Sequence, residues 1–243
     1  MNNFFSALQF LTCWPWPKCR ERSPEELGRS AVFFPVVGLL LGGILVALNF
    51  LLRPVAGGAI ASVLLVAFMA LSTRGLHLDG LSDTFDGLGA GGDKEHILDV
   101  MDDSHIGVFG TIAIVLVLLL KVRAVETLDE SRWQALVLAP VLSRWAMVLL
   151  AYHAAAARQG LGALMIAHLE GRHVAGATLV AVIVGAATAQ SFGLVMLIAV
   201  AALAMGMKFY FHRRLDGITG DICGAAEELS ETSVLVLCAC GLR

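Results

Sequence analysis

Long apolar runs separated by short polar segments dominate this sequence. The run from Ala31 to Leu52 is long enough, at about 1.5 Å per helical residue, to cross the roughly 30 Å hydrocarbon core of a bilayer. A second run, Val55 to Ser72, follows directly, and Pro54, Gly57 and Gly58 between the two predict a tight turn. The pattern therefore predicts a first pair of membrane-spanning helices.

The same pattern continues towards the C-terminus and predicts further spans at Gly107–Val125, Trp133–Ala155, Val174–Ala189 and Phe192–Phe209. Only Gln190 and Ser191 separate the last two, which indicates a helical hairpin. The apolar tail from Thr232 is too short to span unless its helix begins near Ala225 and carries acidic residues into the membrane.

Composition supports this interpretation. The chain has 58% hydrophobic and 15% charged residues and a mean hydropathy of +0.79, whereas soluble domains carry about 25% charged residues. No alternating pattern typical of a barrel occurs. We therefore expect one all-α, polytopic integral membrane domain over residues 1–243, with about six to seven transmembrane helices. The same interpretation places acidic helices on its cytoplasmic side.

The N-terminus predicts a short helix lying at the membrane interface. Phe4, Phe5, Leu8 and Leu11 fall on one helical side, and Trp14 and Trp16 follow at the level where tryptophan favours lipid headgroups. No positive region precedes the apolar residues and no small-residue cleavage site follows, so a cleaved signal peptide is not expected.

Charge and cysteine usage exclude several classes of protein. A net charge of −3 without a basic stripe gives no case for nucleic-acid binding. The cysteines form no CxxC pair, which indicates reduced thiols without structural zinc. Lys and Arg are more numerous on the side that includes the N-terminus, so both polar motifs described below are expected to face the cytoplasm from a cell (inner) membrane. The opposite side is assigned only Arg53, Lys121, Arg123, Arg132 and Arg243.

An acidic helix at Leu76–Leu88 is the first candidate site. Asp79, Asp83 and Asp86 recur at i, i+4 and i+7 and share one stripe, opposite an apolar stripe of Leu81, Phe85 and Leu88. Repelling carboxylates with few cationic neighbours favour a hard cation such as Mg²⁺ or Mn²⁺. The plain alternative is a solvated acidic face. A glycine hinge and a short helix at Asp93–Met101 follow.

A second candidate motif lies at Asp216–Glu231. Asp221 and Glu228 are seven residues apart and share a helix face, and the small Gly224 and Ala225 between them leave room for a ligand. Thr219 sits in a glycine turn whose amides suit phosphate oxygens. Two acid-faced helices on one membrane side can hold metal between them, as a transferase acting on a pyrophosphate requires.

Three more residues are candidates for contact with a phosphate group. Asp103 or Ser104 is expected to cap the helix that begins near Gly107, whose N-terminus favours anions. Arg144 lies inside the fourth predicted span, where a guanidinium faces either a polar cavity or a carboxylate partner. Both roles, phosphate anchor and buried pair, stay open.

Five segments resemble the cobalamin synthase family, the adenosylcobinamide-GDP ribazoletransferases. They are ALQFLTCWPWP at 7–17, FFPVVGLLLG at 33–42, LHLDGLSDTFDGLG at 76–89, DSHIGVFG at 103–110 and GITGDICGAAEEL at 217–229. The sequence departs from the family pattern at four positions: Arg74 and Asp216 replace a usual glycine, Asp102 a usual lysine, and Ser143 a usual glycine.

The resemblance implies a membrane enzyme in which α-ribazole or its 5′-phosphate attacks adenosylcobinamide-GDP, with release of GMP and a requirement for Mg²⁺. On this basis we expect Asp79, Asp83, Asp86, Asp221 and Glu228 to hold metal, with Asp103, Ser104, Arg144 and Thr219 near the phosphates. The ribazole hydroxyl would lose its proton to Asp86 or, as second choice, to His77.

Two other classes compete with this reading. A membrane prenyltransferase also holds Mg²⁺-diphosphate on aspartate-rich helices, but its second motif is rich in spaced aspartates rather than in glycine and threonine. A cation-coupled secondary transporter uses membrane carboxylates, yet no repeat between the halves is visible and Arg144 is nearly the only intramembrane charge expected. The oligomeric state stays open, a homo-oligomer included.

Overall fold

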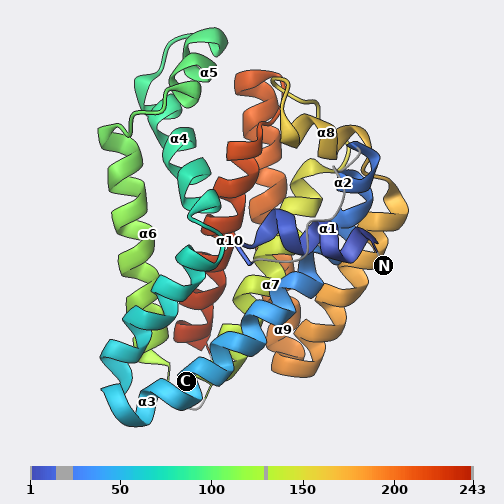
Figure 1. Cartoon of the computed structure of the whole chain (residues 1–243). Coiled ribbons are helices and arrows are strands. Elements are labelled where there is room, and N and C mark those ends of the chain that lie inside the picture. The colour runs from blue at the N-terminus through green and yellow to red at the C-terminus, as the bar shows by residue number, and fades with distance from the viewer. Residues whose placement is uncertain (1, 15–23, 129–130, 242–243) are drawn as a thin grey trace.

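The chain folds into a bundle of helices (Figure 1). The structure is a computed structural model and describes residues 2–14, 24–128 and 131–241. Every regular element in these ranges is helical, apart from one isolated bridge between Ala156 and Ile218, so the all-α prediction is confirmed. The elements are α1 Asn2–Leu11, α2 Pro24–Ser30, the 3₁₀ helix η1 Ala31–Phe33, α3 Phe34–Ser72, α4 Leu76–Ala90, α5 Lys94–Asp102, α6 Val108–Thr127, α7 Arg132–Ala151, α8 Leu161–Ala167, α9 Gly171–Leu215 and α10 Gly220–Gly241.

Four of the described helices are long and apolar enough to cross a membrane: α3 with its N-terminal extension, α6, α7 and α9. Two of them bend sharply. Gly57 breaks α3 with φ 75° and ψ 166°, and Gln190 breaks α9 with φ 48° and ψ −124°. Each bend lies where the sequence predicts a turn between two spans, so the two long helices provide the four arms expected there.

Helix α7 is the centre of the bundle and packs against α3, α9 and α10. Its apolar stretch is 89% buried, whereas the corresponding stretches of the other three long helices are 28 to 44% buried. Glycines bring α3 close: a Cβ at Gly42 would lie 2.9 Å from the Cα of Val137 in α7. The small residues of the first predicted span therefore serve helix packing, as small residues do in membranes.

The outer surfaces of α3, α6 and α9 carry exposed apolar side chains, which include Leu51, Ile60, Leu116, Leu119, Ile183 and Ile198. Exposed leucine and isoleucine in such number are typical of a surface that faces lipid. The protein is a multi-pass helical membrane protein.

The N-terminal helix α1 forms as predicted, but its apolar side packs on the protein. Leu8 and Leu11 are buried in the main core, Phe4 packs edge-on against Phe33, and Phe10 stacks on Phe34. The residues Trp16, Lys18, Cys19, Arg20, Arg22 and Arg243, used in the predictions above, lie outside the described ranges.

One end of the bundle gathers the polar elements: α5, α8, the first turn of α10 and the last of α9 lie together at the top of Figure 1. Side-chain contacts connect them, since Lys94 of α5 pairs with Asp216 at 3.1 Å and Arg214 of α9 donates to the carbonyl of Gly92 at 2.6 Å. The bends of α3 and α9 lie at the opposite end, at the bottom of Figure 1. The predicted short acidic helix is confirmed as α5, capped by Asp93, whose carboxylate accepts from the amide of His96 at 3.0 Å.

The C-terminal segment is a continuous helix, α10, that begins at Gly220 and carries three glutamates into the bundle. The sequence analysis allowed a seventh long helix only if it began well before Thr232 and carried acidic residues with it, and α10 meets both conditions. Its 22 residues correspond to roughly 33 Å at 1.5 Å per residue.

Candidate functional site

The candidate site forms where α4 packs against α10, and two glycines make this packing possible. A Cβ at Gly80 of α4 would lie 2.7 Å from the carbonyl oxygen of Asp221, and one at Gly224 of α10 would lie 3.3 Å from the Cα of His77. Gly224 was expected to leave room for a ligand. Much of that room is taken instead by the backbone of α4, which brings the two acidic motifs together.

Asp79, Asp83 and Asp221 form an acidic cluster at this contact. The pKa of Asp83 is raised to about 7, chiefly because burial removes its water and also because the negative charges of Asp79 and Asp221 act on it. The cation Arg158 opposes the shift, and a smaller contribution from Asp86 adds to it. The raised pKa thus reflects first the burial of Asp83 and then the two carboxylates beside it.

Arg158, in the loop after α7, is the cation of this cluster and was not anticipated from the sequence. Its guanidinium contacts Asp221 at 2.7 Å and also contacts Asp102 at the end of α5. It is partly exposed, with 25% of its side chain accessible, so its charge faces both the carboxylates and solvent. A loop arginine with no local motif gives no signal in a single sequence.

Asp86 does not share the environment of Asp79 and Asp83. Its two carboxylate oxygens accept hydrogen bonds from the amides of Gly107 and Gly110, each at 2.8 Å, and the residue is 9% exposed. Asp86 therefore caps the N-terminus of α6 from a neighbouring helix. The expectation that Asp103 or Ser104 caps this helix is wrong: the Asp103 carboxylate accepts from the amide and ring of His105, at 3.0 and 2.6 Å.

Glu228 also lies apart from the aspartates, inside a buried cluster of charges between α4, α6, α7 and α10. Lys121 of α6 contacts Glu228 and Glu231, each at 2.6 Å, and Arg144 of α7 contacts Glu231 at 2.7 Å and also Glu227. Two roles were left open for Arg144, phosphate anchor and buried ion pair, and the structure shows the buried ion pair. The expectation that Arg144 is nearly the only intramembrane charge is wrong.

His77 joins this buried cluster to the site. Its Nδ1 lies 3.1 Å from Glu227 Oε2, and its Nε2 has no hydrogen-bond partner although the residue is only 1% exposed. His77, Glu227 and Glu228 present potential ligand atoms within 4.8 Å of one another. We favour the aspartate cluster as the cation site because Lys121 and Arg144 already form ion pairs with these glutamates.

Thr219 organises the start of α10. Its hydroxyl accepts from the amide of Ile222 at 3.2 Å and donates to Asp221 at 3.2 Å, so it caps the helix and orients the aspartate. The amide of Ile218 in the same turn donates to the carbonyl of Ala155 at 2.9 Å. The turn is thus tied to the loop that carries Arg158.

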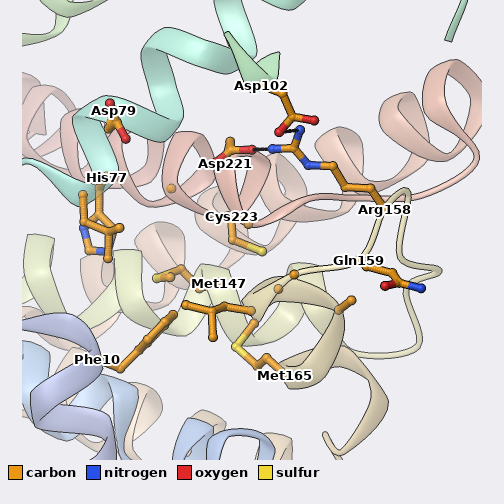
Figure 2. A pocket seen from close by; sticks show the side chains of 17 residues that line it. Phe10, His77, Asp79, Asp102, Met147, Arg158, Gln159, Met165, Asp221 and Cys223 are labelled. Carbon is orange, nitrogen blue, oxygen red and sulfur yellow. Dashed lines mark hydrogen bonds and ion pairs between the residues drawn. The ribbon is translucent and has the colours of Figure 1, made fainter. Parts of the chain in front are cut away.

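Two cavities meet at Asp79. The first, the α8 cavity, has a volume of about 460 Å³ and is lined by Phe10, Leu76, His77, Asp79, Asp102, Met147, Arg158, Gln159, Gly160, Leu161, Gly162, Ala163, Met165, Gly220, Asp221, Cys223 and Gly224. The second, the α6 cavity, has about 610 Å³ and is lined by Gln9, Phe10, Thr12, Thr73, Arg74, Gly75, Leu76, Asp79, Ser82, Asp83, Ser104, Ile106 and Ile114. Figure 2 shows the α8 cavity, with the charged side chains on one side and Phe10, Met147 and Met165 on the other.

Comparison with known proteins shows the family to which the chain belongs. The family model described as cobalamin-5-phosphate synthase matches residues 3–239. The chain belongs to the cobalamin-5-phosphate synthase family. Relatives named adenosylcobinamide-GDP ribazoletransferase occur in Geotalea daltonii, 41% identical over 96% of this chain and 95% of the relative, and in Syntrophobacter fumaroxidans, 38% identical over 98% of both. A third, from Pseudomonas fluorescens, is 40% identical over 97% of this chain and 98% of the relative. No solved structure matches the chain.

Two of the four departures from the family pattern fall on unusual backbone. Arg74 and Asp216 adopt φ of 57° and 56°, in the left-handed region that favours glycine. The structure therefore gives a physical reason for the glycine usual in the cobalamin-5-phosphate synthase family at both positions. The other two replacements have polar partners: Asp102 pairs with Arg158, and the Ser143 hydroxyl donates to Glu227 at 2.9 Å.

Proposed function

We propose that this protein is a membrane-embedded transferase that joins adenosylcobinamide-GDP to α-ribazole or its 5′-phosphate and releases GMP. The observation that carries the proposal is the acidic cluster of Asp79, Asp83 and Asp221 at the junction of two cavities, in a chain that belongs to the cobalamin-5-phosphate synthase family. In the reaction, a ribazole hydroxyl oxygen bonds to the phosphorus next to cobinamide, and the bond from that phosphorus to the oxygen of GMP breaks.

The cluster fits Mg²⁺, the ion that the family resemblance implies. Its donors are carboxylates from two helices, and a bound cation would offset both the burial of Asp83 and the repulsion from Asp79 and Asp221 that raise its pKa. Asp79, Asp83 and Asp221 would hold the ion, and Arg158 with Thr219 keeps Asp221 oriented towards them. When bound, Mg²⁺ supplies positive charge for the pyrophosphate oxygens.

His77 is the residue we assign to accept the hydroxyl proton. The residue lines the α8 cavity together with Asp79, its Nε2 is unpartnered, and its Nδ1 contacts Glu227. Asp86, the first choice from the sequence, has both oxygens engaged by the amides of Gly107 and Gly110 and lines neither cavity. In this proposal Asp86 positions α6.

The proposed orientation puts the site at the cytoplasmic face of the inner membrane. The end of the bundle with the site carries Lys94, Arg158, Arg213 and Arg214, in keeping with the excess of Lys and Arg on cytoplasmic sides. The assignment of Lys121 to the opposite face is wrong, because this residue is buried at 2% exposure in ion pairs. Arg132 is also buried, but it keeps its assigned place at the start of α7, where it donates to the Leu128 carbonyl and to the Asn49 side chain.

The test uses detergent-purified protein given adenosylcobinamide-GDP, α-ribazole 5′-phosphate and Mg²⁺, with GMP and corrinoid products separated by chromatography. We expect equal amounts of GMP and joined corrinoid, and loss of both when a chelator removes the metal. Folded protein that forms neither product in native membranes would overturn the proposal. Uptake of labelled substrate into sealed vesicles without chemical change would instead support a transporter.

A further inference from the structure

The α8 cavity combines an apolar wall with one unpartnered buried polar atom. Phe10, Met147, Met165 and Cys223 provide aromatic and sulfur-containing side chains, and the last three are nearly inaccessible to solvent. Phe10 comes from α1 and Cys223 from α10, whereas Met147 and Met165 come from α7 and α8, so elements from both ends of the chain build the wall (Figure 2). Flexible thioether side chains favour contact with the edges and faces of aromatic rings.

His77 also lines the α8 cavity, and its ring carries a buried nitrogen, Nε2. Its contact with Glu227 fixes one side of the ring, while Nε2 has no hydrogen-bond partner. A buried nitrogen without a partner is unfavourable, and a ligand hydroxyl that donates to it would satisfy it. The combination indicates a ligand that is mostly flat and apolar and carries a polar group at one edge.

The volume of the α8 cavity indicates which of the two substrates of the proposed reaction it can enclose. A cavity of about 460 Å³ is in the range that encloses one drug-sized molecule. α-Ribazole, with about twenty non-hydrogen atoms, is of that size, whereas a corrinoid nucleotide is several times larger. The α8 cavity can therefore enclose the nucleoside but not the corrinoid ring.

We propose that the α8 cavity binds the methylated bicyclic base of α-ribazole, with the base against Phe10, Met147 and Met165 and the ribose towards His77 and Asp79. This inference rests on the proposed function and adds to it the location of one substrate. The apolar base gains from leaving water, and the aromatic ring of Phe10 offers a face or an edge for it.

The shared wall between the cavities explains how the nucleoside meets its partner. Phe10, Leu76 and Asp79 line both cavities, and the α6 cavity beyond them is more polar, with Thr73, Arg74, Ser82 and Asp83 in its wall. A ribose hydroxyl at Asp79 thus stands at the opening to the polar side. The pyrophosphate of the larger substrate enters there, with its corrinoid outside.

The first test needs no protein variant. Wild-type enzyme is assayed with α-ribazole 5′-phosphate and with the analogue that lacks both methyl groups on the base. Because one missing methylene in an apolar pocket costs about tenfold or more, KM for the analogue should rise at least tenfold while KM for adenosylcobinamide-GDP stays constant. An analogue with unchanged KM would overturn the assignment.

The second test narrows the cavity. Ala163→Phe places a large side chain on α8 where Ala163 lines the cavity, and Ala167→Phe makes the same change at an exposed position of the same helix. We expect Ala163→Phe to raise KM for the nucleoside at least tenfold with KM for the corrinoid within twofold of wild type, and Ala167→Phe to change neither. A rise in KM for the corrinoid alone would place that substrate in the cavity and refute the inference.

The transferase function and the location of the base can be refuted by different results. If wild type forms product but neither test changes KM for the nucleoside, the transferase function stands and the location of the base is wrong. If wild type forms no product, quenching of benzimidazole fluorescence on binding to wild type and Ala167→Phe, but not to Ala163→Phe, still locates the base. Equal quenching by all three proteins refutes the location.

Discussion

Substitution of Asp83 by asparagine tests the acidic cluster most directly, because it should make the metal-free protein more stable and the enzyme inactive. The folded-state pKa of Asp83 is about 7, above its ordinary value of 3.8, since burial and the charges of Asp79 and Asp221 disfavour the carboxylate. The folded protein therefore keeps a proton that the unfolded chain loses. Stability contributed by this proton is present at low pH and is lost as pH rises towards 7.

The expected size follows from the pKa shift. A rise from 3.8 to about 7 corresponds to about 4 kcal/mol at 1.36 kcal/mol per unit, for ionisation of Asp83 in the folded protein. Because the side chain is half-buried and water screens its neighbours, about 2 kcal/mol is the more realistic figure. Asp83→Asn removes this penalty, and in a chain of this size about 2 kcal/mol raises Tm by roughly 4 to 8 °C.

The assay is thermal unfolding in detergent without divalent metal, at pH 5 and pH 8, followed by the same measurement with added Mg²⁺. The gain in Tm for Asp83→Asn should be larger at pH 8 than at pH 5, since the penalty grows between pH 4 and 7. Wild type should gain stability from Mg²⁺, whereas the variant should gain little and release GMP at less than 1% of the wild-type rate, because positioning by the metal is lost.

Asp99→Asn is the matched control, since Asp99 is an exposed carboxylate on α5 outside both cavities. It should leave Tm, the response to Mg²⁺ and GMP release unchanged. An Asp83→Asn protein that keeps full Mg²⁺-dependent release of GMP would refute the shared-metal reasoning. Unchanged stability at pH 8 would refute the electrostatic part.

Three further substitutions test the supporting structure. Asp86→Ala removes two charge-assisted hydrogen bonds from amides at the start of α6 and should lower the free energy of unfolding by about 3 kcal/mol. Its kcat should stay within tenfold of wild type at low temperature. A large loss of kcat with unchanged Tm would make Asp86 the base instead. Lys121→Met leaves Glu228 buried without its 2.6 Å partner and should cost about 3 to 5 kcal/mol, measured by thermal unfolding; an unchanged Tm would contradict the buried pair. Gly193→Ala places a methyl group against the backbone of Gly185 and should separate the arms of α9, costing about 1 to 3 kcal/mol, whereas Gly206→Ala in open space on the same helix should cost nothing.

Local features of the fold were readable from the sequence because they depend on neighbouring residues. The bends at Gly57 and Gln190 follow from polar or glycine interruptions between apolar runs, and α5 lies where the sequence predicts a short helix at Asp93–Met101. The apolar stripe of α4 is also where the pattern places it, with Leu81 fully buried. Periodicity indicates which side of a helix is apolar, and no more than that is needed for these features.

The pairing of distant side chains was not readable. Asp79, Asp83 and Asp86 look equivalent on a helical wheel, yet Asp86 binds the amides of α6 because Gly107 and Gly110 come close to it. Such differences depend on which helix packs on which face of α4. A single sequence indicates the polar and apolar faces of a helix but does not say which other helices pack on them.

The ion pairs of the buried charged cluster were also not readable from the sequence. Lys121 resembles the end of a span, and its partners Glu228 and Glu231 follow more than a hundred residues later. A lysine on an apolar helix and glutamates on a late helix signal, at most, that each needs a partner.

The buried glutamates of α10 also bear on how this protein enters its membrane. Each charged side chain costs roughly 2.5 to 3.5 kcal/mol at the centre of an isolated helix during insertion, so Glu227, Glu228 and Glu231 would oppose entry of α10 by itself. The cations paired with them, Lys121 and Arg144, are on helices synthesised earlier. Insertion of α10 thus depends on a partner surface already assembled beside the translocation machinery, and its docking brings Asp221 to α4 only after the other described helices have been made.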